Sequence, residues 1–195
     1  DWRFVEVEPS LDDLGVTETL FSIGNGYLGM RGNPEEGRKS YSHGTFINGF
    51  HETWTIKHAE EAFGFASTGQ TIVNVPDAKL IKIYVDDEPL TLGQSDLDHY
   101  ERALDFRAGC LTRDLVWRTP AGKRVKLSSR RMVSFTDRHL ALFEIELTML
   151  EGDAPIVLSS QVVNRQDGFD DYRQPRNEEG FDPRRAGKFD GRVLQ

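Results

Sequence analysis

The stretch His139-Leu140-Ala141-Leu142-Phe143-Glu144-Ile145-Glu146-Leu147-Thr148-Met149-Leu150 decides the fold class of this chain. Apolar residues at 141, 143, 145, 147 and 149 alternate with Glu144, Glu146 and Thr148. Because successive side chains of a β-strand point to opposite faces, this pattern predicts a strand with one apolar and one polar face. Such alternation is typical of antiparallel sheets that are packed on one side.

The same alternation covers most of the chain between Trp2 and Val163 and predicts about ten strands. Thr119-Pro120-Ala121-Gly122 has proline and glycine where a tight turn needs them, so it predicts a hairpin between strands 111–118 and 124–133. Asp86-Asp87-Glu88-Pro89 ends another strand. The expected fold class is therefore all-β, with two antiparallel sheets packed as a sandwich.

Helical patterns are scarce. We expect one turn at Leu11–Leu14, with Ser10 as its N-cap, and a second short helix at Lys57–Phe63. An alternating βα fold would need many longer helices. The sandwich should therefore contain only a few short helical turns.

The segment Gly24-Asn25-Gly26-Tyr27-Leu28-Gly29 has the G-x-G-x-x-G form of a dinucleotide-binding loop. That function needs a helix directly after the glycines and an acidic residue about 20 residues later. Residues 32–34 (Gly-Asn-Pro) would break the helix, and Thr45-Phe46-Ile47-Asn48 contains no acid. The glycines instead indicate a tight hairpin with Asn25-Gly26 at its tip.

Composition excludes several classes of protein. The net charge of -8 over 195 residues argues against nucleic-acid binding, and no apolar run is long enough to span a membrane.

Cys110 is the only cysteine and no N-x-[ST] site is present, which predicts a reducing, cytoplasmic location. Cys110 itself is expected to be a small buried hydrophobe. His51 and His58 are seven residues apart and do not predict a metal site.

Acidic residues occur in adjacent groups within polar, turn-like surroundings. A general acid needs an apolar pocket to raise its pKa, so these groups are expected to be solvated turn charges. Glu52, beside Trp54, is the one acid with surroundings suited to chemistry. The adjacent groups are Glu35-Glu36, Glu60-Glu61, Asp86-Asp87-Glu88, Asp170-Asp171 and Glu178-Glu179.

The segment from His51 to Gly69 is predicted to be a long, aromatic-rich connection. One interpretation is a sugar site, because aromatic rings and fixed polar groups such as Asn48, Glu52 and Gln70 hold sugars. The other is an apolar patch that is covered by another domain or subunit. We expect the second, and the predicted interface residues are His51, Trp54, Phe63 and Phe65.

A second long segment, from Asn164 to Gly191, is polar and densely charged. It has few apolar residues with which to offset the entropy of ordering, about 1–2 kcal/mol per residue. We expect it to be the most mobile part of the chain.

Five stretches of the sequence form a set of motifs in a fixed order: Thr19–Asn33, Gly44–Phe50, Thr68–Asp77, Leu111–Arg113 and Ser159–Gly168. In this order they resemble the amino-terminal domain of glycoside hydrolase family 65, which contains maltose, trehalose and kojibiose phosphorylases. The resemblance covers nearly the whole chain.

The resemblance implies a super-β-sandwich of the galactose mutarotase type, followed in the family by a helical linker, an (α/α)6 barrel and a small sheet domain. Residues 1–195 would form that amino-terminal domain, without its last strands and without the barrel. In the family the general acid and the phosphate-binding residues lie in the barrel, so no catalytic residue is carried over to this sequence. The resemblance also implies a homodimer, an α-linked glucose disaccharide as substrate, inorganic phosphate as co-substrate in the phosphorylases, and no cofactor.

Three functions remain open from the sequence. The first is a non-catalytic domain that supports the barrel, the rim of its active site or a dimer interface. The second is an independent carbohydrate-binding module. The third is an aldose mutarotase, which would need a carboxylate base and a histidine acid inside a concave sheet. The resemblance implies that this chain is part of a longer parent enzyme. The barrel of that enzyme, outside this sequence, would determine which disaccharide is used and whether phosphate or water attacks it.

Overall fold

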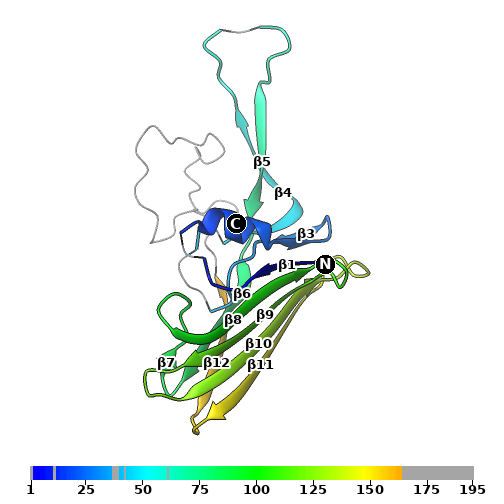
Figure 1. Ribbon diagram of the computed structural model, residues 1–195. Coiled ribbons are helices and arrows are strands. Elements are labelled where there is room, and N and C mark those ends of the chain that lie inside the picture. The colour runs from blue at the N-terminus through cyan, green and yellow to red at the C-terminus, as the bar shows by residue number, and fades with distance from the viewer. Residues whose placement is uncertain (1, 11, 37–39, 42, 61, 164–195) are drawn as a thin grey trace.

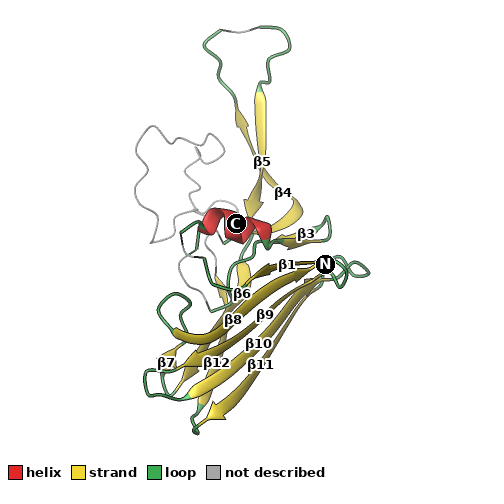
Figure 2. Ribbon diagram, viewed as in Figure 1, coloured by secondary structure: helices red, strands yellow, loops and turns green. Residues whose placement is uncertain are grey.

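The computed structural model describes residues 2–10, 12–36, 40–41, 43–60 and 62–163. In this part the chain forms antiparallel sheets and one short helix (Figures 1 and 2). The predicted antiparallel β fold with little helix is confirmed, and its hydrogen-bonded ladders divide it into three sheets. No helix among the described residues is long and apolar enough to cross a membrane.

The largest sheet has five strands, and its central hairpin is the one that the turn signal predicts. Gly122 has a φ of 81°, and its N–H donates to the carbonyl of Thr119 over 2.8 Å. The ladder then aligns Trp117 with Val125. In spatial order the strands are β1 (Arg3–Glu6), β8 (Asp96–Asp105), β9 (Cys110–Arg118), β10 (Arg124–Val133) and β11 (Ala141–Glu151).

A three-stranded sheet packs against the inner face of the five-stranded sheet. Its strands are β12 (Ile156–Val163), β6 (Asp77–Val85) and β7 (Glu88–Pro89). Asp86 and Asp87 join β6 to β7 with φ values of 51° and 65°, which confirms the predicted turn. The core between the two sheets consists of Ile83, Val85, Leu90, Leu92, Tyr100, Leu115, Trp117, Val125 and Leu127.

The third sheet begins with the short hairpin of β2 (Ile23–Gly24) and β3 (Leu28–Met30). Gly26 has a φ of 85° at its tip, and the Asn25 side chain accepts the N–H groups of Tyr27 and Leu28, which confirms the predicted hairpin. A second apolar cluster, which includes Phe21 and Met30, joins this sheet to the five-stranded sheet.

The third sheet continues into β4 (Thr45–Thr55) and β5 (Thr68–Asn74), which project from the body as a two-stranded arm (Figure 1). The ladder is interrupted between Phe46 and His51 and then runs regularly to the pair Thr55 and Thr68. The prediction that 51–69 is one long connection is therefore wrong at both ends, because strand residues occupy 51–55 and 68–69. The aromatic and β-branched residues of these ends favour a strand.

Both helix predictions are corrected. The helix α1 spans Leu14–Leu20 and is capped by Asp13, whose Oδ1 accepts the N–H of Val16 over 3.2 Å, so Ser10 is not the cap. The described residues of the second predicted helix, 57–60 and 62–63, are not helical. The mobile segment predicted at 164–191 lies outside the described residues.

Candidate functional site

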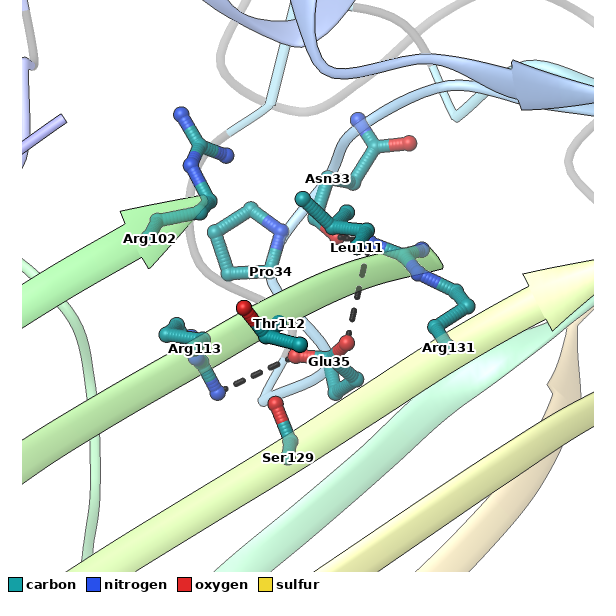
Figure 3. Close-up of a pocket in the computed structure, with 9 residues that line it drawn as sticks. All are labelled: Asn33, Pro34, Glu35, Arg102, Leu111, Thr112, Arg113, Ser129 and Arg131. Atoms are coloured by element: carbon teal, nitrogen blue, oxygen red, sulfur yellow. Dashed lines mark hydrogen bonds and ion pairs between the residues drawn. The ribbon is translucent and has the colours of Figure 1, made fainter. Parts of the chain in front are cut away.

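Charged side chains occupy the middle of the inner face of the five-stranded sheet. Along β9, Arg113 lies on the same face as the core residues Leu111 and Leu115, and along β10, Arg131 lies on the same face as Leu127. The loop formed by residues 31–36 covers these arginines from above (Figure 3). We call the resulting group the ion cluster; its members are Glu35, Glu36, Arg102, Arg113 and Arg131.

Two carboxylates from the loop meet the arginines of the sheet in the ion cluster. Arg113 donates from Nη1 and Nη2 to the two carboxylate oxygens of Glu36, over 2.8 and 2.7 Å. Its Nη2 also lies 3.1 Å from Oε2 of Glu35, while Nη2 of Arg131 lies 3.6 Å from Oε1 of Glu35. All four side chains are at most 6 % exposed. The pairing is therefore bidentate, buried and charge-assisted.

The remaining contacts attach the backbone of the loop to the sheet. Arg131 donates to the carbonyl of Asn33 over 2.9 Å, and Arg102 donates to the carbonyl of Gly32 over 2.8 Å. Arg102 also forms an ion pair with Glu6 at 2.8 Å, which links β1 to the same network. The cluster thus holds together segments that are far apart in the sequence.

The prediction that Glu35-Glu36 is a solvated turn pair is wrong. The two residues are 4 % and 5 % exposed, because the loop is pressed onto inward-facing arginines. Burial alone would raise the pKa of Glu35, but Arg113 and Arg131 outweigh it and hold the pKa below its usual value. A general acid needs the opposite shift. Glu35 is therefore suited to a structural role rather than to general-acid catalysis.

A small cavity adjoins the ion cluster and is lined by Asn33, Pro34, Glu35, Arg102, Leu111, Thr112, Arg113, Ser129 and Arg131 (Figure 3). Its volume is about 10 Å³, which has room for one water. Sites for small molecules usually enclose about 300–1,000 Å³. This cavity cannot hold a sugar.

A second buried charge group anchors the root of the arm. Nζ of Lys79 donates to Oδ1 of Asp77, Oγ1 of Thr45 and the carbonyl of His43, over 2.8, 2.7 and 2.6 Å. Burial lowers the pKa of Lys79 to about 8, although the neighbouring Asp77 carboxylate acts in the opposite direction. Nδ1 of His43 lies 3.2 Å from Asp77. These contacts join the first residue of β4 to the start of β6.

The predicted interface residues are spread along the arm. His51 and Trp54 lie on β4, opposite Ile72 and Gly69. The Trp54 ring covers the backbone of Gly69, where an added Cβ would come within 2.3 Å of the ring. Phe63 and Phe65 lie in the connection between the strands and are 109 % and 54 % exposed. Their role as an interface stays a prediction.

The other predicted site residues have ordinary surroundings. Cys110 is 8 % exposed, and burial raises the pKa of its thiol, so it is buried as expected and poorly suited to act as a nucleophile. Glu52 lies on the arm opposite Thr71, outside the apolar core. Among the described residues, no group of three or more histidines, cysteines and carboxylates is placed to hold a metal ion.

The sequence contains a signal for the ion cluster that the positions of the acidic pairs do not reveal. Ser129 and Arg131 alternate in phase with Leu127 and Val133, so they had to face the core. A buried arginine requires a buried anionic or carbonyl partner. That requirement indicates that an acidic loop lies on the inner face, but it does not identify which acidic residues pair with Arg131.

Residues 4–195 match the family described as Glycosyl hydrolase family 65, N-terminal domain. An uncharacterized glycosyl hydrolase of Mycobacterium tuberculosis is 37% identical over 175 residues, which cover 90% of this chain and 22% of that protein. The alpha,alpha-trehalose phosphorylase of Thermoanaerobacter brockii is 38% identical over 180 residues, covering 90% of this chain and 23% of the enzyme.

Among solved structures, one described as "Putative kojibiose phosphorylase from human microbiome" superimposes with a TM-score of 0.65 at 28% sequence identity. The match covers 75% of this chain and 19% of that chain. This chain thus spans about a fifth of the length of the relatives that it matches.

Proposed function

The chain belongs to glycosyl hydrolase family 65 as an amino-terminal domain, and we propose that it is the non-catalytic β-sandwich of an inverting α-glucoside phosphorylase or hydrolase. In this proposal it supports the catalytic barrel, the rim of the active site or a dimer interface. The named relatives include trehalose and kojibiose phosphorylases, which act on α-linked glucose disaccharides. The parent enzyme would use such a disaccharide, with inorganic phosphate as co-substrate if it is a phosphorylase.

The observation that carries this proposal is the state of the buried acids. Glycoside chemistry needs a carboxylic acid whose pKa is raised and an open site beside it. The buried acids of the described chain are Glu18, Glu35, Glu36 and Asp77. Each is paired with a cation: Glu18 with Arg31, Glu35 and Glu36 with Arg113, and Asp77 with Lys79. The pKa values of Glu35 and Asp77 are lowered. The adjoining cavity is also too small for a sugar. These features support a structural role.

The arm supports the interface part of the proposal. The arm projects from the body (Figure 1). Phe63 and Phe65, in the connection between β4 and β5, are exposed. Exposed aromatic side chains on a projecting segment are suited to burial by another protein segment. The barrel of the same polypeptide and a second subunit are both suitable partners.

The catalytic part of the proposal is tested with the purified chain. Maltose, trehalose or kojibiose is incubated with inorganic phosphate, and glucose 1-phosphate is measured against a buffer blank, with the full-length parent as positive control. No release is expected from the chain alone. Release well above the blank would refute a non-catalytic role.

An independent carbohydrate-binding module is the second candidate, favoured by Trp54 and its polar neighbours on the arm. It predicts saturable quenching of tryptophan fluorescence by maltose that Trp54→Ala removes. The interface proposal predicts no sugar response and, in sedimentation, an association that Trp54→Ala weakens. Because Trp2 and Trp117 also fluoresce, the variant serves as the reference for the Trp54 signal. A glucose anomerisation assay on the same sample tests the mutarotase alternative.

A further inference from the structure

The small cavity beside the ion cluster lies between the loop of residues 31–36 and the inner face of the five-stranded sheet (Figure 3). Its volume of about 10 Å³ is the space that one water molecule needs. All the residues that line it, except Pro34 and Leu111, have polar side chains. An apolar cavity stays dry, whereas a polar cavity with two to four hydrogen-bonding groups can hold a water. The composition of the lining therefore favours a bound water.

Three buried donors without a partner belong to residues that line this cavity. Arg102, Arg113 and Arg131 are at most 3 % exposed, and the Nε–H of each has no hydrogen-bond partner among the described residues. Their Nη groups differ in this respect, because each arginine donates from Nη to a carboxylate or a carbonyl. A buried donor that stays unpaired destabilises a fold. A hydrogen-bond acceptor inside the cavity would remove this penalty.

Acceptor capacity is present at the same cavity. Oε1 of Glu35 lies 3.6 Å from Nη2 of Arg131, which is beyond hydrogen-bonding distance. The two oxygens of Glu36, in contrast, accept from Arg113 over 2.8 and 2.7 Å. A carboxylate has about four acceptor positions, so Glu35 can accept a further hydrogen bond. The Ser129 hydroxyl, which points towards Glu35 in Figure 3, can both donate and accept.

The charges around the cavity determine which kind of molecule fits there. The three arginines are matched by three carboxylates, which belong to Glu35, Glu36 and Glu6, the partner of Arg102 at 2.8 Å. Because these charges balance, they exert no net attraction on an ion. The Glu35 carboxylate would repel an anion in the cavity, and the arginines would repel a cation. A small neutral molecule that donates and accepts hydrogen bonds fits this environment.

We propose that the cavity binds one water molecule, which bridges the loop to the sheet. The water accepts a hydrogen bond from an arginine Nε–H and donates one to the Glu35 carboxylate, and the Ser129 hydroxyl is a further partner. Buried waters make about three hydrogen bonds to groups that the protein leaves unsatisfied. The water thus completes the ion cluster without changing its charge. This inference goes beyond the proposed function, because the water holds the loop and takes no part in sugar chemistry.

A crystal structure of the chain tests the identity of the bound molecule. One density peak is expected in the cavity, at about 2.7–3.2 Å from an arginine Nε and from an oxygen of Glu35. Soaking the crystals in bromide distinguishes a water from a halide, because bromide scatters anomalously. An anomalous peak in the cavity would show that it binds an anion and would overturn the proposal. A map that shows surface waters but no peak in the cavity would overturn it as well.

Matched serine variants test for the same water in solution. Magnetic relaxation dispersion of the solvent counts the waters that stay bound for longer than the protein takes to tumble. Ser129→Val places a methyl group in the cavity and should lower this count by about one. Ser129→Ala also removes the hydroxyl but leaves the space, so the count should stay unchanged. The crystal structure of the wild type decides the question even if Ser129→Val does not fold.

A third variant controls for the larger side chain. Ser128 lies on the opposite face of β10, where its hydroxyl donates to Asp114. Ser128→Val therefore adds the same methyl group away from the cavity, and the count of bound waters should not change. A count that stays the same in Ser129→Val, or that falls equally in Ser128→Val, would refute the assignment of the water to this cavity.

Hydrogen exchange tests what the water does for the loop. The N–H of Ile81 donates to the carbonyl of Glu35 over 2.7 Å, so its exchange reports how firmly the loop is held. Loss of the water in Ser129→Val leaves an arginine donor unpaired, and exchange at Ile81 should accelerate by about tenfold. Ser129→Ala keeps the water and should accelerate it by less than about threefold.

The remaining outcomes of the exchange experiment contradict the bridge. Equal acceleration in Ser129→Val and Ser129→Ala would mean that the serine hydroxyl, rather than a water, holds the loop. Faster exchange in Ser129→Val without a loss of bound water would mean that the larger side chain strains the site. Either result would refute the bridging role of the water.

Discussion

The sandwich body buries its apolar and charged side chains, whereas the projecting arm exposes residues of the same types. In the body, Leu115 and Val85 are 0 % exposed, and buried charges are matched by partners at hydrogen-bonding distance. On the arm, Phe63 is fully exposed and the edge of β5 is unpaired among the described residues. The described body thus buries its apolar and charged side chains against one another, whereas the arm exposes an aromatic side chain and a strand edge.

The two regions also differ in what holds them in place. The body depends on contacts between distant segments, such as Arg113 with Glu36, which are 77 positions apart. The arm depends on local pairing and on contacts at its root, where β4 pairs with β3 and Lys79 binds the first residue of β4. Substitutions should therefore affect global stability in the body and local behaviour or association in the arm.

The largest expected effect is that of Arg113→Met. The substitution leaves Glu35 and Glu36 buried without their main cation, and removing one partner of a buried ion pair costs about 3–5 kcal/mol. Urea unfolding at pH 7 should show this loss. As control, Arg130→Met removes an exposed pair with Glu144, which contributes less than about 1 kcal/mol. Similar losses in both variants would contradict the importance of burial.

The strands of the body could be predicted because their alternation is a local property of the sequence. Residues 111–118, 124–133 and 141–150 are strands as expected, and the turns at 119–122 and 86–87 have the expected backbone geometry. Glycine and aspartate tolerate positive φ, so these residues determine where the chain reverses. No knowledge of distant contacts was needed.

The ion cluster could not be predicted in the same way. Whether Glu35 is solvated depends on Arg131, which is 96 positions away, and the polar loop around it has the composition of an exposed turn. Trp54 presents a related difficulty, because the aromatic content of 51–69 indicates a covered segment but not that its ends are strands. Local composition therefore failed where tertiary contacts determine the environment.

Acid should weaken the body through its buried carboxylates. Burial would raise the pKa values of Glu35 and Asp77, but their cationic and hydrogen-bonding neighbours outweigh it and lower both. Such groups stabilise the fold above their unfolded pKa values, about 4.3 and 3.9, and this stabilisation is lost as the pH falls towards the folded values. The free energy of unfolding should therefore change little between pH 7 and 5 and fall progressively below about pH 5.

Denaturant titrations at each pH check this expectation. Glu35→Gln should reduce the dependence on pH, because one of the two groups no longer titrates. Glu144→Gln, on the exposed face of β11, should leave the dependence unchanged. A stability that falls equally in all three proteins would assign the acid effect to general charge repulsion.

A smaller and local effect is expected from Gly69→Val. Its Cβ would lie 2.3 Å from the Trp54 ring, so the ring must leave the ribbon and the pairing of β4 with β5 should weaken by about 1–3 kcal/mol. Hydrogen exchange should accelerate at 52–55 and 68–71 and stay unchanged in β9 and β10. As control, a Cβ at Gly29 meets nothing within 4 Å, so Gly29→Ala should leave exchange in the arm unchanged. In the wild-type chain itself, we also expect hydrogen exchange to be slower in β9 and β10 than in the arm.

The smallest effect on stability is expected from Phe63→Ser. This substitution distinguishes the arm from the body most clearly, because it should change association rather than stability. Phe63 is 109 % exposed, so its removal should change the free energy of unfolding by less than about 0.5 kcal/mol. The buried Phe21, at 1 % exposure, is the matched position in the body, and Phe21→Ala should cost about 3–5 kcal/mol. If the arm is an interface, Phe63→Ser should nevertheless weaken association in sedimentation, because it removes an apolar side chain that only a partner can bury. A loss of stability without a change in association would mean that the ring packs against this chain itself.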